Sequence, residues 1–233
     1  MNLAVIPARG GSKRIPRKNI KLFCGKPMIA WSIEAALTSG CFDKVIVSTD
    51  DLEIAAVARE WGADVPFMRP AELADDFIGT MPVVKQALQA MASQGMVVEH
   101  VCCLYATAPF VTAEALTEGF RTLKSSGACF AFSVTSYAFP IQRSIRLDSR
   151  GRVSMFQPEH FLTRSQDLED AFHDAGQFYW GTGAAWLAET PIFSSEAAAI
   201  ILPRYRVQDI DTLEDWLRAE WMFKAIQATE VRL

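Results

Sequence analysis

The chain has 233 residues, half of them hydrophobic, and a formal net charge of −4 at pH 7. This length and composition fit one domain with a substantial core and exclude a disordered chain. The acidic balance also excludes a general attraction to nucleic acid or to an anionic membrane, so a polyanion would have to be bound by a local cluster.

Short apolar runs alternate with amphipathic stretches through the first half of the chain. Strands are predicted at residues 3–6, 45–48, 101–104 and 129–134, and helices at residues 28–39, 81–91 and 113–124. A further helix is expected between Asp50, as its cap, and Gly62, as its end. Apolar strands without clean alternation, separated by helices, predict a Rossmann-like α/β fold whose mostly parallel sheet is covered by helices on both faces. Ligands of such folds bind at the carboxyl ends of the strands.

The alternation of strands and helices breaks over residues 137–175. Pro140, Pro158 and a turn-like sequence before Gly151 lie there among many charges, which indicates an inserted arm. Strands at residues 178–180 and 200–202 and a last helix at residues 213–226 resume the pattern. We therefore expect one domain over residues 1–233, with an arm inserted at about 137–175.

The cysteines and the first residues bear on the compartment. Cys102 and Cys103 are adjacent in a predicted strand, so their side chains would point to opposite faces and form a poor disulfide or metal clamp. The first residues lack a basic stretch followed by a long apolar one, and no apolar run approaches the roughly 20 residues of a membrane span, so we expect neither a signal peptide nor a membrane helix. We expect reduced thiols in a cytoplasmic protein with no membrane partner.

The most specific local pattern follows the first predicted strand directly. Five of the eleven residues in 9–19 are basic, although the chain as a whole is acidic. Glycine lets the backbone approach a ligand closely, while arginine and lysine offer donors for phosphate, so the pattern predicts a triphosphate site. The spacing is neither that of a P-loop nor that of a dinucleotide fingerprint. The alternative is a solvated basic loop. The residues are Arg9, Gly10, Gly11, Ser12, Lys13, Arg14, Ile15, Pro16, Arg17, Lys18 and Asn19.

Two carboxylates lie close together near the end of the chain. Residues two apart in an extended segment face the same way, so Asp209 and Asp211 would project together. Such a pair suits Mg²⁺, which takes one or two carboxylates together with substrate phosphates. The alternative is that both aspartates only flank the start of the last helix, where Thr212 and Asp215 predict a capping box.

These patterns together resemble a known family. The loop at residues 9–19, residues 45–50, residues 69–73 and Asp209-Ile210-Asp211 are similar, in order and along nearly the whole chain, to the CMP-sialic acid synthetase (acylneuraminate cytidylyltransferase) family. Residues 139–143, 163–167 and 173–181 resemble its pseudaminic acid branch. Sialic acid enzymes usually carry Gln at the position of Tyr105 and Arg near that of His173-Asp174, so these departures favour pseudaminic acid.

The resemblance implies a homodimer whose arm reaches the partner's site, and it implies a role for each of three residue groups. CTP would be bound by Arg9, Gly10, Gly11, Ser12, Lys18, Asn19, Arg69 and Thr80, and Mg²⁺ by Asp209 and Asp211. The nine-carbon acidic sugar would be bound by Tyr105, Gln142, Arg143, Arg164 and Gln177.

The expected reaction is attack of the anomeric hydroxyl of the sugar on the α-phosphorus of CTP, with release of pyrophosphate. Lys18 and Arg9 would neutralise the developing charge, and Asp211 would act through the metal or as a base. A metal-bound hydroxide and His173 are the other candidates for the base. A metal-dependent glycosyltransferase and a non-catalytic nucleotide-binding module are the competing interpretations.

Overall fold

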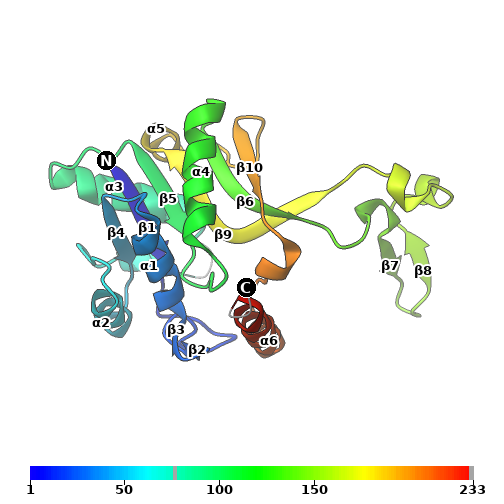
Figure 1. Cartoon of the computed structure of the whole chain (residues 1–233), viewed down its shortest axis with the longest axis horizontal. Helices are drawn as coiled ribbons and strands as arrows, with labels where there is room; N and C mark the ends of the chain where they lie inside the picture. Colours follow the sequence, from blue (N-terminus) through cyan, green and yellow to red (C-terminus); the bar gives the residue numbers. More distant parts are fainter. Residues whose placement is uncertain (76–77, 231–233) are drawn as a thin grey trace.

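A six-stranded mixed sheet forms the centre of the computed structural model, which describes residues 1–75 and 78–230. Its strands lie in the order β10-β6-β9-β5-β1-β4 (Figure 1). β9 runs antiparallel to both β5 and β6, whereas the other neighbouring strands are parallel. The prediction of a Rossmann-like, mostly parallel sheet is confirmed. The strands are β1 (Asn2–Pro7), β4 (Lys44–Ser48), β5 (His100–Leu104), β6 (Phe130–Ser136), β9 (Phe172–Thr182) and β10 (Ala197–Ile201).

Helices cover both faces of this sheet, as predicted. Alternate residues of β1 enter two different cores: Ala4 packs with α1, α2 and α4 on one face, and Val5 with α3 and α5 on the other. A strand buried on both faces has no polar side to show, which explains its unbroken apolar sequence. The helices are α1 (Met28–Ser39), α2 (Leu52–Glu60), α3 (Thr80–Ser93), α4 (Ala113–Ser126) and α5 (Gly183–Leu187).

The helix ends follow the sequence signals, with one correction. α1 has the predicted bounds, and Gly40 ends it in the left-handed conformation at φ 64°. The predicted cap of α2 at Asp50 is wrong by one residue. Asp51 has the extended backbone of a cap, and its carboxylate accepts the Glu53 and Ile54 N–H groups at 3.0 and 2.9 Å.

The last helix, α6 (Leu213–Glu230), packs away from the sheet on a third core. Trp216 and Phe223 contact the ring of Phe23 edge to face, with centroids 5.4 and 5.5 Å apart. Phe23 belongs to the short ribbon of β2 (Leu22–Phe23) and β3 (Lys26–Pro27), which follows the loop after β1. This packing brings the segment before α6 beside that loop.

The segment between β6 and β9 leaves the body of the protein as an arm (Figure 1). It carries a hairpin of β7 (Ile145–Leu147) and β8 (Val153–Met155). β9 begins at Phe172, so the last four residues of the predicted arm, 172–175, belong to the central sheet. No helix in the described part of the chain is long and apolar enough to span a bilayer. Short 3-10 turns complete the chain: η1 (Ala71–Leu73), η2 (Ile141–Arg143), η3 (Pro158–His160), η4 (Ser165–Asp167) and η5 (Arg204–Arg206).

Candidate active site

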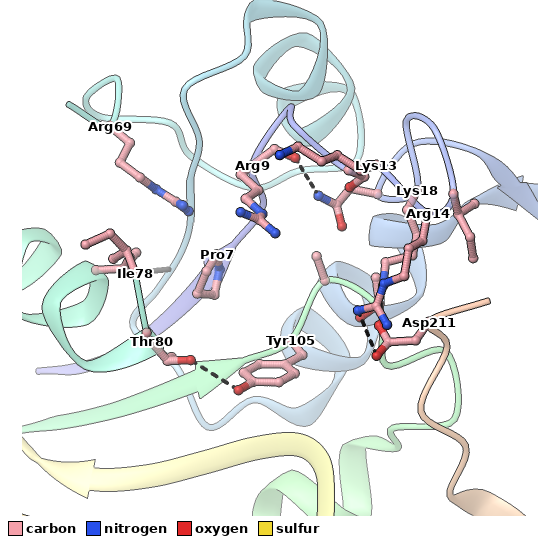
Figure 2. A pocket seen from close by; sticks show the side chains of 17 residues that line it. Pro7, Arg9, Lys13, Arg14, Lys18, Arg69, Ile78, Thr80, Tyr105 and Asp211 are labelled. Carbon is pink, nitrogen blue, oxygen red and sulfur yellow. Dashed lines mark hydrogen bonds and ion pairs between the residues drawn. The ribbon is translucent and has the colours of Figure 1, made fainter. Parts of the chain in front are cut away.

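A cleft of about 330 Å³, which we call the first cleft, opens at the carboxyl ends of β1 and β5. Figure 2 shows the loop after β1 on one side, Arg69 and Thr80 on the other, and Tyr105 across the floor. This is the edge at which parallel α/β sheets bind ligands. Its lining includes Arg9, Ser12, Lys13, Arg14, Lys18, Asn19, Arg69, Thr80, Tyr105 and Asp211.

Gly10 and Gly11 have different roles in the loop. A Cβ on Gly10 would lie 2.7 Å from Oδ2 of Asp51, so only glycine fits against that carboxylate. The Gly10 N–H donates to Asp50 at 3.0 Å and is therefore engaged within the protein. A Cβ on Gly11 would meet nothing within 4 Å. Protein packing does not require glycine at Gly11, which fits the expectation that a ligand approaches there.

Four of the five basic residues of the loop line the first cleft, and Arg17 does not. Arg17 has a left-handed backbone at φ 56° and turns its guanidinium to Asp51 and Glu53. Its nitrogens lie 2.5 and 2.9 Å from the two Asp51 oxygens. The Arg17 guanidinium lowers the pKa of Asp51 to about 2. Arg17 thus holds the loop in place, and the basic residues that line the first cleft are Arg9, Lys13, Arg14 and Lys18.

The loop meets the carboxylate segment that lies 192 residues further along the chain. Nζ of Lys18 donates to the carbonyl of Ile210 at 2.6 Å and lies 3.4 Å from Oδ1 of Asp211. Arg14 pairs with the other oxygen of Asp211 at 2.9 Å. Two sequence motifs of opposite charge therefore form one site.

Arg69 and Asn19 reach the first cleft from buried positions. Nε of Arg69 donates to the hydroxyl of Ser48 at 3.1 Å, and a terminal nitrogen of Arg69 donates to the Ser48 carbonyl. Burial lowers the pKa of Arg69 to about 10, which still leaves the guanidinium charged at neutral pH. Asn19 donates to the carbonyl of Arg9 at 2.9 Å and so supports the loop.

A second cleft of about 490 Å³ adjoins the first, and Tyr105 lines both. The hydroxyls of Tyr105 and Thr80 are hydrogen-bonded at 3.1 Å. Asp209 lies in this second cleft, whereas Asp211 lines the first. Partial desolvation and the charge of Asp211 raise the pKa of Asp209, although its side chain keeps exposed surface. The lining of the second cleft is Tyr105, His173, Asp174, Ala175, Gly176, Tyr179, Val207, Gln208 and Asp209.

Of the residues expected to bind the sugar, Tyr105 lines both clefts, and the other four are not among the described residues that line either of them. Gln142 and Arg143 are held in the arm, where they donate to the carbonyls of Glu169 and Thr163. Arg164 also lies in the arm and pairs with Asp167 at 2.6 Å. Gln177 is buried on β9 and donates to the carbonyl of Arg206 at 2.5 Å.

Asp174 and Tyr179 both line the second cleft. The resemblance placed His173-Asp174 near the sugar, whereas Tyr179 could equally be read as a packing residue of its strand. The register of β6 and β9 shifts between Phe132 and Val134, and Gly176 has a φ of 62°. This bulge lets the Asp174 carboxylate accept the Tyr179 hydroxyl. Gly176, just before the strand predicted at residues 178–180, was the available signal, because a glycine in a strand often marks a bulge.

The sheet, the basic loop at its carboxyl edge and the adjoining carboxylates define a nucleotide-binding α/β protein. A family model described as cytidylyltransferase matches residues 3–216. The chain belongs to the cytidylyltransferase family of enzymes.

Individual relatives agree with this family, and a solved structure agrees with the fold. The chain is 48% identical over 96% of both sequences to a pseudaminic acid cytidylyltransferase of Campylobacter jejuni subsp. jejuni. It is 33% identical, over 97% of each sequence, to a CMP-N,N'-diacetyllegionaminic acid synthase of Legionella pneumophila subsp. pneumophila. Its fold matches a CMP:2-keto-3-deoxy-manno-octonic acid synthetase with a TM-score of 0.69 at 17% identity, covering 98% of this chain and 99% of that one.

Proposed function

We propose that this enzyme transfers CMP from CTP to the anomeric hydroxyl of a nine-carbon acidic sugar, pseudaminic acid, and releases pyrophosphate. One observation carries the proposal: a first cleft lined by four basic residues of one loop adjoins a second cleft at Tyr105. A triphosphate in the first cleft and a polyhydroxylated acceptor in the second would meet where the two clefts join, and the transfer would take place there. We take the nucleotide to be CTP because the chain belongs to the cytidylyltransferase family.

The first cleft suits a reaction that develops negative charge on a leaving pyrophosphate. Lys18 is held by the Ile210 carbonyl and Asp211, and Arg9 donates to the Asp75 carbonyl at 2.8 Å, so both cations are oriented before substrate arrives. Oriented charges need little reorganisation in the transition state, which is the main source of catalysis in phosphoryl transfer. Lys18 and Arg9 are the residues to which we assign this role, and Gly11, Ser12, Asn19, Arg69 and Thr80 would bind the rest of the nucleotide.

Asp209 and Asp211 suit a magnesium ion. Their mutual repulsion contributes to the raised pKa of Asp209, and a divalent cation between hard carboxylate oxygens would relieve it. Within residues 1–75 and 78–230, no group of three or more His, Cys, Asp or Glu side chains could enclose a metal. A pair that leaves other ligand positions to phosphate and water is what Mg²⁺ commonly uses. When bound, the ion would supply charge neutralisation at the phosphates.

The second cleft also gives a reason to propose a homodimer. In the described part of the chain, the residues that line it include no Lys or Arg, although the proposed sugar carries a carboxylate. The arm carries Arg143 and Arg164, and one face of its hairpin is apolar and exposed. We assign that face to a partner subunit, whose second cleft would receive Gln142, Arg143 and Arg164. The exposed apolar residues of the hairpin are Ile145 at 54%, Leu147 at 67% and Val153 at 65%.

The relatives support the choice of sugar. The relative that is 48% identical is named for pseudaminic acid, and the one that is 33% identical is named for a different nonulosonic acid. The five cysteines are free thiols, as expected in a reducing compartment, and we place the enzyme in the cytoplasm.

A screen of sugar acids tests the proposal. Pseudaminic acid, sialic acid and an eight-carbon keto-deoxy acid would each be mixed with CTP and Mg²⁺, and pyrophosphate release would be followed. We expect the highest kcat/KM with pseudaminic acid, and little turnover when UTP replaces CTP. Equal use of sialic acid would refute the sugar assignment alone. The absence of pyrophosphate release with every sugar acid would refute the reaction.

A further inference from the structure

A fixed pair of hydrogen bonds lies in the wall of the second cleft. The hydroxyl of Tyr179 donates to Oδ2 of Asp174, and Oδ1 of Asp174 accepts the Gly176 N–H at 2.8 Å. The ring of Tyr179 is held between Phe132 and Tyr105, with centroids 5.8 and 5.4 Å away. Tyr179 is only 4% exposed, so neither its ring nor its hydroxyl can reorient easily.

The direction of these bonds decides what the wall can offer a ligand. A phenol has one proton, and a carboxylate has none, so the Tyr179 proton is committed to Asp174. The phenolic oxygen then presents only lone pairs, and these face the cleft and the hydroxyl of Tyr105, its other hydrogen-bond partner. The carboxylate of Asp174 likewise accepts and does not donate.

His173 and Asp209 also offer hydrogen-bond acceptors to the second cleft. Nδ1 of His173 lies 2.8 Å from the Asp174 carbonyl, which can only accept, so the ring proton lies on Nδ1. When the ring is neutral, Nε2 is then an acceptor. Asp209 adds a second carboxylate, and the described lining residues include no Lys or Arg. The walls contributed by this chain thus offer acceptors from Asp174, Tyr179, His173 and Asp209.

We propose that Asp174 and Tyr179 select the acceptor sugar by accepting a hydrogen bond from the N–H of one of its acylamino groups. In this arrangement Tyr179 binds the donor, and Asp174 is the positioning residue that takes up the Tyr179 proton. The inference rests on the proposed function. An amide N–H can only donate, so it matches a site of lone pairs, whereas the sugar carboxylate is repelled and must point elsewhere. A sugar amide would therefore enter with its N–H toward β9 and its carbonyl away.

The test uses the full-length enzyme, pseudaminic acid and its two analogues in which one amide or the other is N-methylated. Methylation removes the donor and leaves the carbonyl in place. We expect the wild type to lose about tenfold or more in kcat/KM with one of the analogues, because a buried acceptor is left unpaired. In Tyr179→Phe the natural sugar should lose about tenfold, the same analogue should lose little further, and the KM for CTP should stay within about twofold.

Asp174 is tested by a pair of variants in which Tyr179 is retained. Asp174→Ala frees the phenolic proton and should abolish most of the discrimination against the methylated analogue. Asp174→Asn keeps an oxygen that can accept this proton, so this variant should retain more of the discrimination than Asp174→Ala does. A purely structural role would instead shift the melting temperature and both KM values together. Tyr205→Phe, on the exposed turn η5, is the matched control and should leave all constants unchanged.

Unchanged discrimination in Tyr179→Phe overturns the inference, as does a wild type that accepts both analogues as well as the natural sugar. If Tyr179→Phe does not fold, the two Asp174 variants decide by the same discrimination ratio. A wild type that releases no pyrophosphate with any sugar acid would overturn the proposed function itself.

Discussion

Arg17 and Asp51 form a bidentate ion pair that ties the loop after β1 to the first turn of α2, at 2.5 and 2.9 Å. The same carboxylate caps α2 and lies against Gly10, so one side chain holds both ends of the loop. Arg17 itself lies outside the lining of the first cleft. It should therefore affect ligand binding only through the shape of the loop.

Replacing Arg17 with Met should loosen the loop without removing a ligand contact. We expect the KM for CTP to rise about tenfold, as a misplaced binding loop loses preorganised contacts. Initial rates at varied CTP measure this. Arg121→Met, which breaks the bidentate pair with Glu118 on the surface of α4, is the matched control and should leave the KM unchanged. An unaltered KM in Arg17→Met would remove the loop-holding role.

The same pair predicts how stability depends on pH. The pKa of Asp51 is lowered in the folded protein to about 2, so its contribution is present above the ordinary carboxyl pKa. That contribution is lost as pH falls from about 4 to about 2. With solvent screening at the partly exposed Arg17, it is about 1 kcal/mol. The free energy of unfolding, measured in urea, should fall less between pH 5 and pH 3 in Asp51→Asn than in wild type. Each protein is compared with its own value at pH 5.

Lys18→Ala and Arg9→Ala should each lower kcat strongly while the fold survives. Asp211 would keep its pair with Arg14 at 2.9 Å when Lys18 is removed, so no buried charge is stranded. Circular dichroism and melting curves should stay near wild type. Lys85→Ala, which breaks the Lys85–Glu189 pair at 3.2 Å, controls for loss of a partly exposed lysine. A fully active Lys18→Ala enzyme would exclude the loop from the mechanism.

We predict that Asp211 is needed for metal-dependent turnover, whereas the neighbouring Asp215 is needed for stability. Asp211→Ala should abolish turnover, whereas Asp215→Ala should mainly destabilise the fold by about 1 kcal/mol through loss of a helix cap. The capping role is visible in the structure, since Asp215 accepts the Thr212 N–H at 2.8 Å and donates its own N–H to Thr212 at 3.2 Å. Chelation should stop wild-type turnover, and added Mg²⁺ should restore it. Equal losses of kcat at both positions would contradict the metal assignment.

The exposed apolar face of the hairpin in the arm predicts that the protein forms a dimer. Leu147→Asp and Val153→Asp would place charges on the exposed apolar face of the hairpin, and we expect the dimer to dissociate. Light scattering across a dilution series gives the mass, and activity should fall with it if the arm completes the partner's second cleft. Arg146→Asp, on the other face of the hairpin, is the control. A fully active monomer would refute the assembly.

The sequence predicted much of the fold because the signals were local. The apolar runs of β1, β4 and β5 and the glycine end of α1 need no knowledge of distant partners. The resemblance assigned the loop and Asp211 to one nucleotide site, and in the structure Nζ of Lys18 lies 3.4 Å from Asp211.

Other features depended on contacts that no local pattern encodes. β9 reads as a short strand in the sequence, but its pairing with both β5 and β6 extends it to Phe172–Thr182. Arg17 could not be told apart from the other basic residues of the loop, because its partner Asp51 lies on another element. Asp174 and Tyr179 meet only through the bulge, so their shared cleft could not be predicted from spacing.

The arm runs without interruption into β9, so the hairpin and the part of the second cleft that β9 lines are encoded by neighbouring stretches of one gene segment. On the proposed function, a single recombination within residues 137–182 would exchange the subunit contact and the sugar preference together. The residues that line the first cleft, including Asp211, lie outside this segment and would pass to the descendant unchanged. New sugar specificities could then arise by inheritance of a whole segment, with the matching partner surface already included.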